Sequence, residues 1–396
     1  MNMNEQMKES EESILHTYNR FPVVFEKGQG CYLYDSEGKE YLDFAAGIAV
    51  NSLGYHYPGY DEALKDQIDK LMHISNLYYN EPIIEAGAKL VKASKMSKAF
   101  FTNSGTEAIE GALKAAKKYA YVRDGHADHE IIAMNHSFHG RSIGALSVTG
   151  TAHYREPFEP LMGGVKFADF NDLESVKAQI TDKTCAIITE VVQGEGGIYP
   201  AKKEFLEGLR QICDEKDIML IFDEIQCGMG RTGHYFAWQA YGVQPDIMTS
   251  AKALGCGVPV GAFVLNEKAA KASLEPGDHG TTYGGNPFVC AAVSKVFDIY
   301  ENDKIIEHVQ EMTPYLEQKL EEIVAKHECA ATRRGMGFMQ GIVIQGRPVG
   351  EVVKAALAKG LLVISAGSDV LRIVPPLVIT KEHIDKMAAI LDECME

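Results

Sequence analysis

The chain has 396 residues, with 39 lysines and arginines against 55 aspartates and glutamates, so its formal net charge is −16. This acidity argues against nucleic acid as a partner, because affinity for the phosphate backbone depends on clustered basic side chains. The longest stretch without a charged residue, 44–60, is interrupted by glycines and a proline, and the N-terminus is polar, so we expect neither a membrane span nor a secretion signal. Eight cysteines are scattered without a C-x-x-C pair, which favours a reduced, cytoplasmic protein, and no spacing predicts a metal site.

The first 60 residues predict a short helix followed by a β-hairpin in residues 30–41, where two alternating apolar runs flank the turn sequence DSEGKE. From residue 61 onward, helical patterns alternate with short apolar strands, which is typical of a mostly parallel α/β sheet. Helices are expected near residues 61–72, 82–94, 105–122 and 203–216, and strands near 98–102, 130–134, 185–191 and 217–222.

The pattern changes again after about residue 300. The expected elements there are a helix at 303–326, strands near 338–345, a helix at 349–360, short strands at 361–364 and 370–374, and a last helix from 381. This order indicates a small α+β domain, with which the first 60 residues are expected to pack. The sequence therefore predicts an N-terminal segment 1–60, a large domain 61–299 and a small domain 300–396.

The segment FFTNSGTEA, residues 100–108, joins an apolar strand to a helix. Ser104 or Thr106 can cap that helix, and Gly105 lets a ligand approach the backbone. Free N–H groups and the helix dipole favour a phosphate at such a place. By itself, however, the pattern also fits an ordinary capped helix.

Two further apolar strands each deliver one ionisable residue at the carboxyl end. IMLIFDEIQ places Asp223 directly after five apolar residues, at the sheet edge where ligands of open α/β sheets bind. A buried aspartate there needs a cationic partner, a metal or a protonated heterocycle, although a helix cap or a salt bridge would also explain it. DIMTSAKALG places Lys252 among apolar neighbours, where desolvation would lower its pKa and suit Schiff-base chemistry, unless it is simply an exposed loop lysine.

The helix start at residues 104–106, Asp223 and Lys252 indicate a cofactor site more strongly in combination than each does alone. A phosphate cradle, a carboxylate that can hold a protonated pyridine nitrogen and a strand-end lysine make up the protein's half of a pyridoxal phosphate site.

Over nearly its whole length the chain resembles the class III aminotransferases of the pyridoxal phosphate fold-type I superfamily, and most closely the acetylornithine aminotransferases. The resemblance is carried by seven segments in order: NSGTEAIEGALK, FHGRSIGALSVTG, QGEGGIYPA, LIFDEIQCGMGRTG, SAKALGCGVPVGA, GTTYGGNP and VLRIVPPL. It implies a large domain with a mostly parallel sheet of the seven-stranded type, and a small α+β domain built from both ends of the chain.

The resemblance also implies roles around the cofactor. Lys252 matches the lysine that binds pyridoxal phosphate covalently, Asp223 the acid that pairs with the pyridine nitrogen, and Gln226 a residue near the phenolic oxygen. The remaining matches are the phosphate-binding turn at Ser104, Gly105 and Thr106, the aromatic residue against the ring at Phe138, and a residue reaching the phosphate from a neighbouring subunit at Thr282. A homodimer with shared active sites follows from that last match.

On the substrate side, Arg141 matches a ligand of the substrate carboxylate, and Thr281 a residue near the substrate. Glu195 and Arg372 match a pair that handles the two substrates in turn. Ile48 stands where enzymes similar to ornithine δ-aminotransferase have a tyrosine that helps recognise a free α-amino group. Because Ile48 cannot hydrogen-bond an ammonium group, an acylated α-amine is the better fit.

The resemblance therefore implies transfer of the δ-amino group of N2-acetyl-L-ornithine to 2-oxoglutarate, as in arginine biosynthesis. Ornithine, succinylornithine, N-acyl-diaminopimelate and 4-aminobutyrate remain alternative donors, since enzymes acting on them share most of these motifs. A pyridoxal phosphate-dependent aminomutase would use the same lysine without a second substrate. A cofactor-binding regulator would need a DNA-binding module, and no residues are left over for one.

Overall fold

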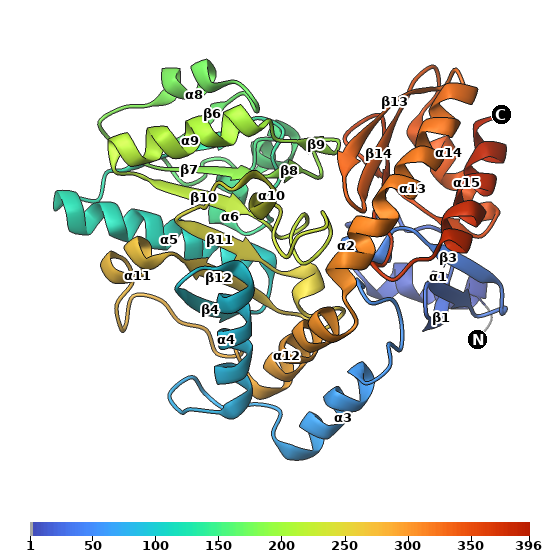
Figure 1. Ribbon diagram of the computed structural model, residues 1–396, viewed down its shortest axis with the longest axis horizontal. Coiled ribbons are helices and arrows are strands. Elements are labelled where there is room, and N and C mark those ends of the chain that lie inside the picture. The colour runs from blue at the N-terminus through green and yellow to red at the C-terminus, as the bar shows by residue number, and fades with distance from the viewer. Residues whose placement is uncertain (1–2) are drawn as a thin grey trace.

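The computed structural model describes residues 3–396, which form two lobes side by side (Figure 1). The larger lobe is built on a seven-stranded sheet with the order β4-β12-β11-β10-β7-β5-β6. Its strands are β4 (Lys98–Thr102), β5 (Glu130–Met134), β6 (Val165–Ala168), β7 (Thr184–Glu190), β10 (Met219–Asp223), β11 (Ile247–Ser250) and β12 (Gly261–Leu265). Only β12 runs against its neighbours, so the predicted mostly parallel sheet is confirmed.

Helices cover both faces of this sheet because its strands alternate apolar side chains between the two sides. In β10, Met219 and Ile221 pack towards α5, while Leu220 and Phe222 pack in the cluster on the opposite face. The first face carries α5 (Gly105–Asp124), α6 (Ile143–Ser147) and α11 (Glu267–Ala272). The second carries α4 (Glu81–Ser94), α9 (Lys203–Lys216) and α12 (Pro287–Asn302).

The smaller lobe combines both ends of the chain. β3 (Glu40–Asp43) pairs in parallel with β15 (Leu361–Leu362), completing a sheet with β1 (Phe25–Gln29) and β2 (Tyr32–Asp35). A second sheet has the order β13-β14-β17-β16, with bounds Ala330–Met336, Met339–Ile344, Val370–Ile373 and Ile364–Ala366. The helices here are α13 (Ile305–Lys326), α14 (Val349–Ala358) and α15 (Lys381–Met395).

The remaining elements are short or lie at the edges of the lobes. They are α1 (Met3–Ser13), α2 (Ala46–Ala49), α3 (Tyr60–Lys70), α7 (Ala152–Arg155), η1 (Glu156–Phe158), α8 (Leu173–Gln179), β8 (Val192–Gln193), β9 (Tyr199–Pro200), α10 (Trp238–Tyr241) and η2 (Lys252–Leu254).

The structure corrects the sequence-based elements in a few places. The strands β6, β12 and β13 and the helix α12 are not among the elements predicted from the sequence. β6 has only four residues, and α12 is apolar on most of its surface, which weakens its helical periodicity. The predicted domain boundary between residues 299 and 300 falls inside α12, and the chain turns instead at Asp303 and Lys304, where Lys304 has a positive φ of 53°. The division into three units remains a prediction.

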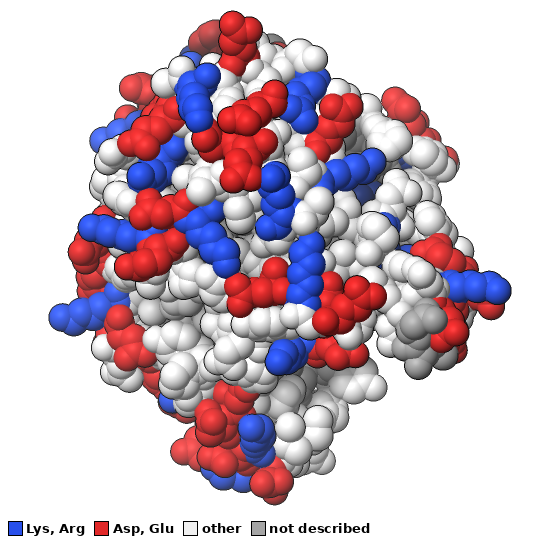
Figure 2. All heavy atoms as spheres, turned by 90° about the vertical axis from the view of Figure 1, so that its right-hand side faces the viewer, with Lys and Arg blue, Asp and Glu red and all other residues white. Residues whose placement is uncertain are grey.

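The surface has a mixed charge distribution. On the face that carries the C-terminal elements, acidic and basic side chains are interspersed, without a broad basic area (Figure 2). Within residues 3–396, no helix is long and apolar enough to cross a membrane.

Candidate active site

A cavity of about 520 Å³ lies at the carboxyl ends of the central strands, next to the first turn of α5. Ligands of open α/β sheets bind at this edge. The cavity brings together nine residues predicted from the sequence: Ser104, Gly105, Thr106, Phe138, Arg141, Glu195, Asp223, Gln226 and Lys252.

The first turn of α5 forms one wall of the cavity. Ser104, rather than Thr106, is the N-cap, and its Oγ accepts a hydrogen bond from the N–H of Glu107 at 3.3 Å. The first N–H groups of a helix have no partner within it and attract an anion. A side chain at Gly105 would place its Cβ 2.9 Å from Ile225, and one at Gly140 would lie 2.3 Å from the Thr106 hydroxyl. Packing therefore restricts both positions to glycine, and Gly105 and Gly140 both line the cavity.

A row of three polar side chains crosses the ends of adjacent strands. The register pairs Asp223 of β10 with Glu190 of β7 on one side and with Thr249 of β11 on the other. Asp223 is buried and accepts hydrogen bonds from the Thr249 hydroxyl at 3.3 Å and from the N–H of Ile225 at 3.0 Å. Its Oδ2 lies 2.7 Å from Nδ1 of His139, which is also buried. These contacts hold the carboxylate at the sheet edge.

Glu190 and His139 are site residues that the sequence analysis missed. Burial, together with the neighbouring Asp223, raises the pKa of Glu190 well above its usual value. Two buried atoms here, Glu190 Oε2 and His139 Nε2, have no hydrogen-bond partner in the described part of the chain. The sequence does contain patterns that indicate these two residues. Glu190 ends an apolar strand as Asp223 does, and His139 lies within the segment HSFHG.

Lys252 follows β11 and has a positive φ of 48°, which turns its side chain out of the strand direction and into the cavity. Burial lowers the pKa of its ammonium group to about 8, and the nearby Arg372 contributes to this shift. A lysine with this pKa has a substantial neutral fraction near pH 7 to 8 and can act as a nucleophile or a base.

Glu195 and Arg372 form an ion pair at the side of the cavity. Arg372 Nη1 donates to Glu195 Oε1 at 2.5 Å and to Gln226 Oε1 at 3.1 Å, and Nη2 donates to the carbonyl of Ser365 at 3.1 Å. Burial would raise the pKa of Glu195, but the charge of Arg372 outweighs it and keeps this pKa below its usual value. Glu195 is therefore ionised and paired.

Arg141 is held by aromatic rings. Its guanidinium carbon lies 4.0 Å from the ring centre of Tyr154 and 5.4 Å from that of Phe138. No acidic partner is recorded for Arg141 among the described residues, so its donors are available to an anionic ligand in the cavity.

Three predicted site residues lie outside this cavity. The Thr281 hydroxyl accepts a hydrogen bond from Asn103 at 3.1 Å and so lies beside the cavity wall. Thr282 is exposed, as a residue serving a neighbouring subunit would be. Ile48 is 44% exposed and lines a second, adjacent cavity, to which Arg372 also contributes. The roles of all these residues remain predictions.

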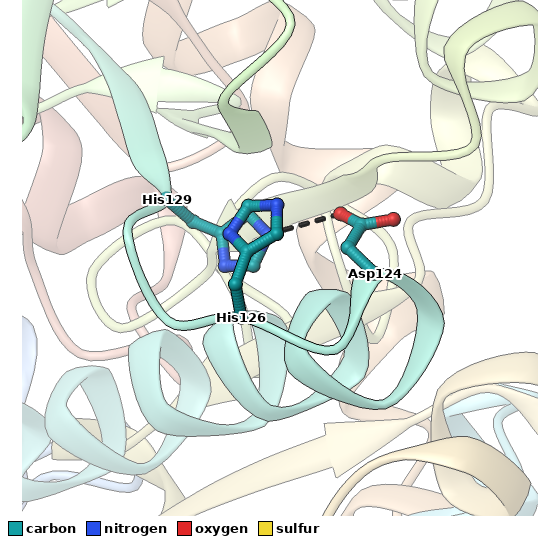
Figure 3. Close-up of side chains that lie close together, drawn as sticks. All are labelled: Asp124, His126 and His129. Atoms are coloured by element: carbon teal, nitrogen blue, oxygen red, sulfur yellow. Dashed lines mark hydrogen bonds and ion pairs between the residues drawn. The ribbon is translucent and has the colours of Figure 1, made fainter.

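A separate cluster of Asp124, His126 and His129 lies at the far end of α5 (Figure 3). Nε2 of the buried His129 lies 2.9 Å from Asp124, whose two oxygens also accept hydrogen bonds from Arg123 at 2.6 Å each. The acid is thus already engaged by a guanidinium group. Because α5 has 20 residues, roughly 30 Å of helix separates the cluster from the cavity, and the prediction of a metal-free active site is unaffected.

Comparisons with known proteins agree with this geometry. The family Aminotransferase class-III matches residues 14–395. The acetylornithine aminotransferase of Clostridium acetobutylicum is 47% identical over 388 residues, covering 98% of this chain and 100% of that protein. The crystal structure of N-acetylornithine aminotransferase from Stenotrophomonas maltophilia superimposes with a TM-score of 0.84 at 35% identity, over 98% of both chains. Ornithine aminotransferase from Toxoplasma gondii has a TM-score of 0.95 at 28% identity, over 100% of this chain and 95% of that one. The chain belongs to the class III aminotransferases.

Proposed function

We propose that this chain transfers the δ-amino group of N2-acetyl-L-ornithine to 2-oxoglutarate, giving N-acetylglutamate 5-semialdehyde and L-glutamate, a step of arginine biosynthesis. The observation that carries the proposal is the convergence of three groups in one cavity: the first turn of α5, Asp223 and Lys252. The acetylornithine aminotransferases to which the chain is similar support the choice of substrate.

The residues fit pyridoxal 5'-phosphate. The N–H groups at Gly105 and Thr106 suit its phosphate, and the buried acidic side chain of Asp223 suits a protonated pyridine nitrogen. Lys252, with its lowered pKa, suits a bond to its aldehyde. When bound, the cofactor supplies a conjugated ring that accepts the electron pair left behind as the substrate loses a proton.

The side chains of the cavity have separate roles in the reaction. Asp223 keeps the proton on the ring nitrogen, and His139 and Thr249 hold Asp223 in place. Nζ of Lys252 removes the proton from the reacting carbon of the substrate and returns it at the neighbouring position. The position of Phe138 on the cavity wall suits contact with the ring, and Arg141 binds a substrate carboxylate.

Two substrates with different groups at the reacting carbon bind in the same site. The ion pair between Glu195 and Arg372 allows the site to accept both. The donor presents a CH₂ group at the reacting carbon, whereas 2-oxoglutarate presents a carboxylate there. Glu195 neutralises Arg372 while the donor is bound. When the keto acid arrives, its carboxylate replaces Glu195 on Arg372. Glu195 belongs to the glycine-rich segment QGEGG, which suits movement of this side chain.

We also propose a homodimer. Large apolar side chains are exposed between α3 and α4, where Leu77 is 85% and Tyr79 is 96% exposed, and Tyr283 beside Thr282 is exposed as well. Exposed apolar patches of this kind mark protein interfaces. A second copy seated there would cover them and bring Thr282 to the partner's phosphate site. The free thiols, most of them buried, fit a reducing compartment such as the cytoplasm.

A panel of amines with 2-oxoglutarate, read as glutamate formed, tests the proposal. N2-acetylornithine is expected to have the highest kcat/KM, ahead of free ornithine and 4-aminobutyrate. A comparable or higher value for free ornithine would overturn the substrate assignment, and product without any need for 2-oxoglutarate would indicate an aminomutase. Light scattering of the purified protein tests the dimer.

A further inference from the structure

The loop between β10 and α10, residues 224–237, extends from the active-site cavity to the smaller lobe, and we name it the linking loop. Its two ends are tied together by Glu224, which is fully buried. The side-chain oxygens of this acid accept hydrogen bonds from the N–H groups of Ala237 and Trp238, at 2.8 Å each. These bonds hold the linking loop as one closed unit.

Arg231 lies in the middle of the linking loop and is 1% exposed. No acidic partner is recorded for it in the described part of the chain, and its Nη1 donates to the carbonyl of Phe338 at 3.4 Å and to that of Pro375. Burial lowers the pKa of this guanidinium group to about 10, so it is still charged near pH 7. A buried charge without an acid costs free energy that an apolar side chain would not. Packing alone therefore does not account for an arginine at this position.

The two carbonyl groups that Arg231 contacts lie beside the strands that present Arg372. Phe338 directly precedes β14, and Pro375 comes two residues after the end of β17. Because the strands are antiparallel, with Arg372 paired to Gly341, the start of β14 and the end of β17 lie at the same end of the sheet. One side chain from the larger lobe thus holds both strands at that end.

The backbone and a neighbouring side chain of the linking loop strengthen this contact. The carbonyl of Arg231 accepts a hydrogen bond from the N–H of Phe338 at 2.8 Å. The approach is so close that a Cβ at Gly337 would lie 2.5 Å from the same carbonyl oxygen. Gln226, in the same loop, accepts the 3.1 Å hydrogen bond from Nη1 of Arg372. The linking loop therefore contacts Arg372 directly, and its supporting strands through Arg231.

We propose that Arg231 is a positioning residue for Arg372: by holding the carbonyl groups beside β14 and β17, it fixes the strand that presents Arg372 to the active-site cavity. The inference rests on the proposed function, in which Arg372 binds a carboxylate of 2-oxoglutarate. Without Arg231, the end of β17 can shift relative to the linking loop, and Arg372 loses its fixed position. The keto acid should be affected more than the amine donor, because Glu195 neutralises Arg372 while the donor is bound.

The first test removes the guanidinium group while keeping an unbranched side chain. In Arg231→Met, calorimetric binding of glutarate to the holoenzyme should weaken about tenfold, and the KM for 2-oxoglutarate should rise in parallel, as for one lost charged hydrogen bond. The half-reaction with N2-acetylornithine should change by less than about twofold. Arg231→Lys keeps one charged donor and should recover part of the binding. The control Arg210→Met removes a guanidinium group that pairs with Asp246, before the start of β11, and should leave glutarate binding unaltered.

The second test asks whether Arg231 acts through Arg372. In an Arg372→Ala background, Arg231→Met should weaken glutarate binding by less than about twofold, because the group that it positions is already absent. Gly337→Ala disturbs the same contact from the smaller lobe, since its Cβ would meet the carbonyl of Arg231. It should also weaken glutarate binding, and it decides the question if Arg231→Met does not fold.

The outcomes separate this inference from the proposed function. If the wild type forms no glutamate from N2-acetylornithine and 2-oxoglutarate, the proposed function fails. If Arg372→Ala weakens glutarate binding but neither Arg231→Met nor Gly337→Ala does, Arg231 does not position Arg372, and the proposed function stands. An equal loss from Arg231→Met with and without Arg372 would also refute the inference. If Arg372→Ala leaves glutarate binding unchanged, the inference fails together with the proposed role of Arg372.

Discussion

The active-site cavity and the second cavity beside Arg372 differ in how the chain builds them. The first uses strand ends and a helix N-terminus of a single sheet, and each of its main groups lies in a contiguous motif, as Lys252 does in SAKALG. The second brings together residues more than 300 positions apart, such as Arg20 and Lys354. Under the proposed function, we expect the chemistry common to many donors to reside in the sheet edge and the choice between donors to depend on residues where the two chain ends meet.

The largest expected effect comes from the sheet edge. Lys252→Ala should keep the cofactor through Asp223 and the α5 turn but lose turnover by at least about 10³-fold, because Lys252 is the only lysine among the described residues that line the cavity. Single-turnover absorbance measures the loss, and borohydride reduction of the wild type followed by peptide mapping should label Lys252. A label on another lysine would refute the assignment.

The ion pair between Glu195 and Arg372 comes next. Glu195→Ala leaves Arg372 permanently free, so the half-reaction with N2-acetylornithine should slow by roughly 10- to 100-fold, the range of a lost charged hydrogen bond. The half-reaction with 2-oxoglutarate should persist, and glutamate should become a better donor. Stopped-flow absorbance of each half-reaction gives the result. Equal losses in both would mean that the pair is only structural.

The lowered pKa of Lys252 predicts a pH dependence within the active-site cavity. Only the neutral amine attacks the cofactor aldehyde, and below a pKa of about 8 most of Lys252 is protonated. The rate at which the apoprotein binds pyridoxal phosphate covalently should therefore rise about tenfold from pH 7 to a plateau above pH 9. In Arg372→Ala the midpoint should move to higher pH, since removing the nearby positive charge favours the ammonium form. A midpoint near 10.5 in the wild type would contradict the burial of this lysine.

The smallest effect is expected at the second cavity. Ile48→Tyr introduces a hydroxyl beside the donor's α-nitrogen and should shift the kcat/KM ratio towards free ornithine by about fivefold, since one polar contact contributes about 1 kcal/mol net. Ile48→Leu serves as the matched apolar control. If both variants shift the ratio equally, a change in the backbone turn at Ile48 rather than the hydroxyl is responsible.

Much of the fold and the shared chemistry could be predicted from the sequence alone. Apolar strands that end in Asp223 and before Lys252, and a glycine-containing turn that begins α5, are local patterns, and parallel strands place their carboxyl ends at one edge without further information. The predicted helix at 203–216 coincides with α9.

Only the tertiary structure determines which side chains from different motifs come into contact. The register between β7 and β10 sets Glu190 beside Asp223, and the chain path after β5 brings His139 to the same acid. Residues 19–23, Ile48 and α14 come together only in the folded chain, and they form the second cavity beside Arg372. Periodicity reports which face of an element is apolar, but register, backbone strain and contacts between distant segments depend on the packing of the whole chain, which no local pattern encodes.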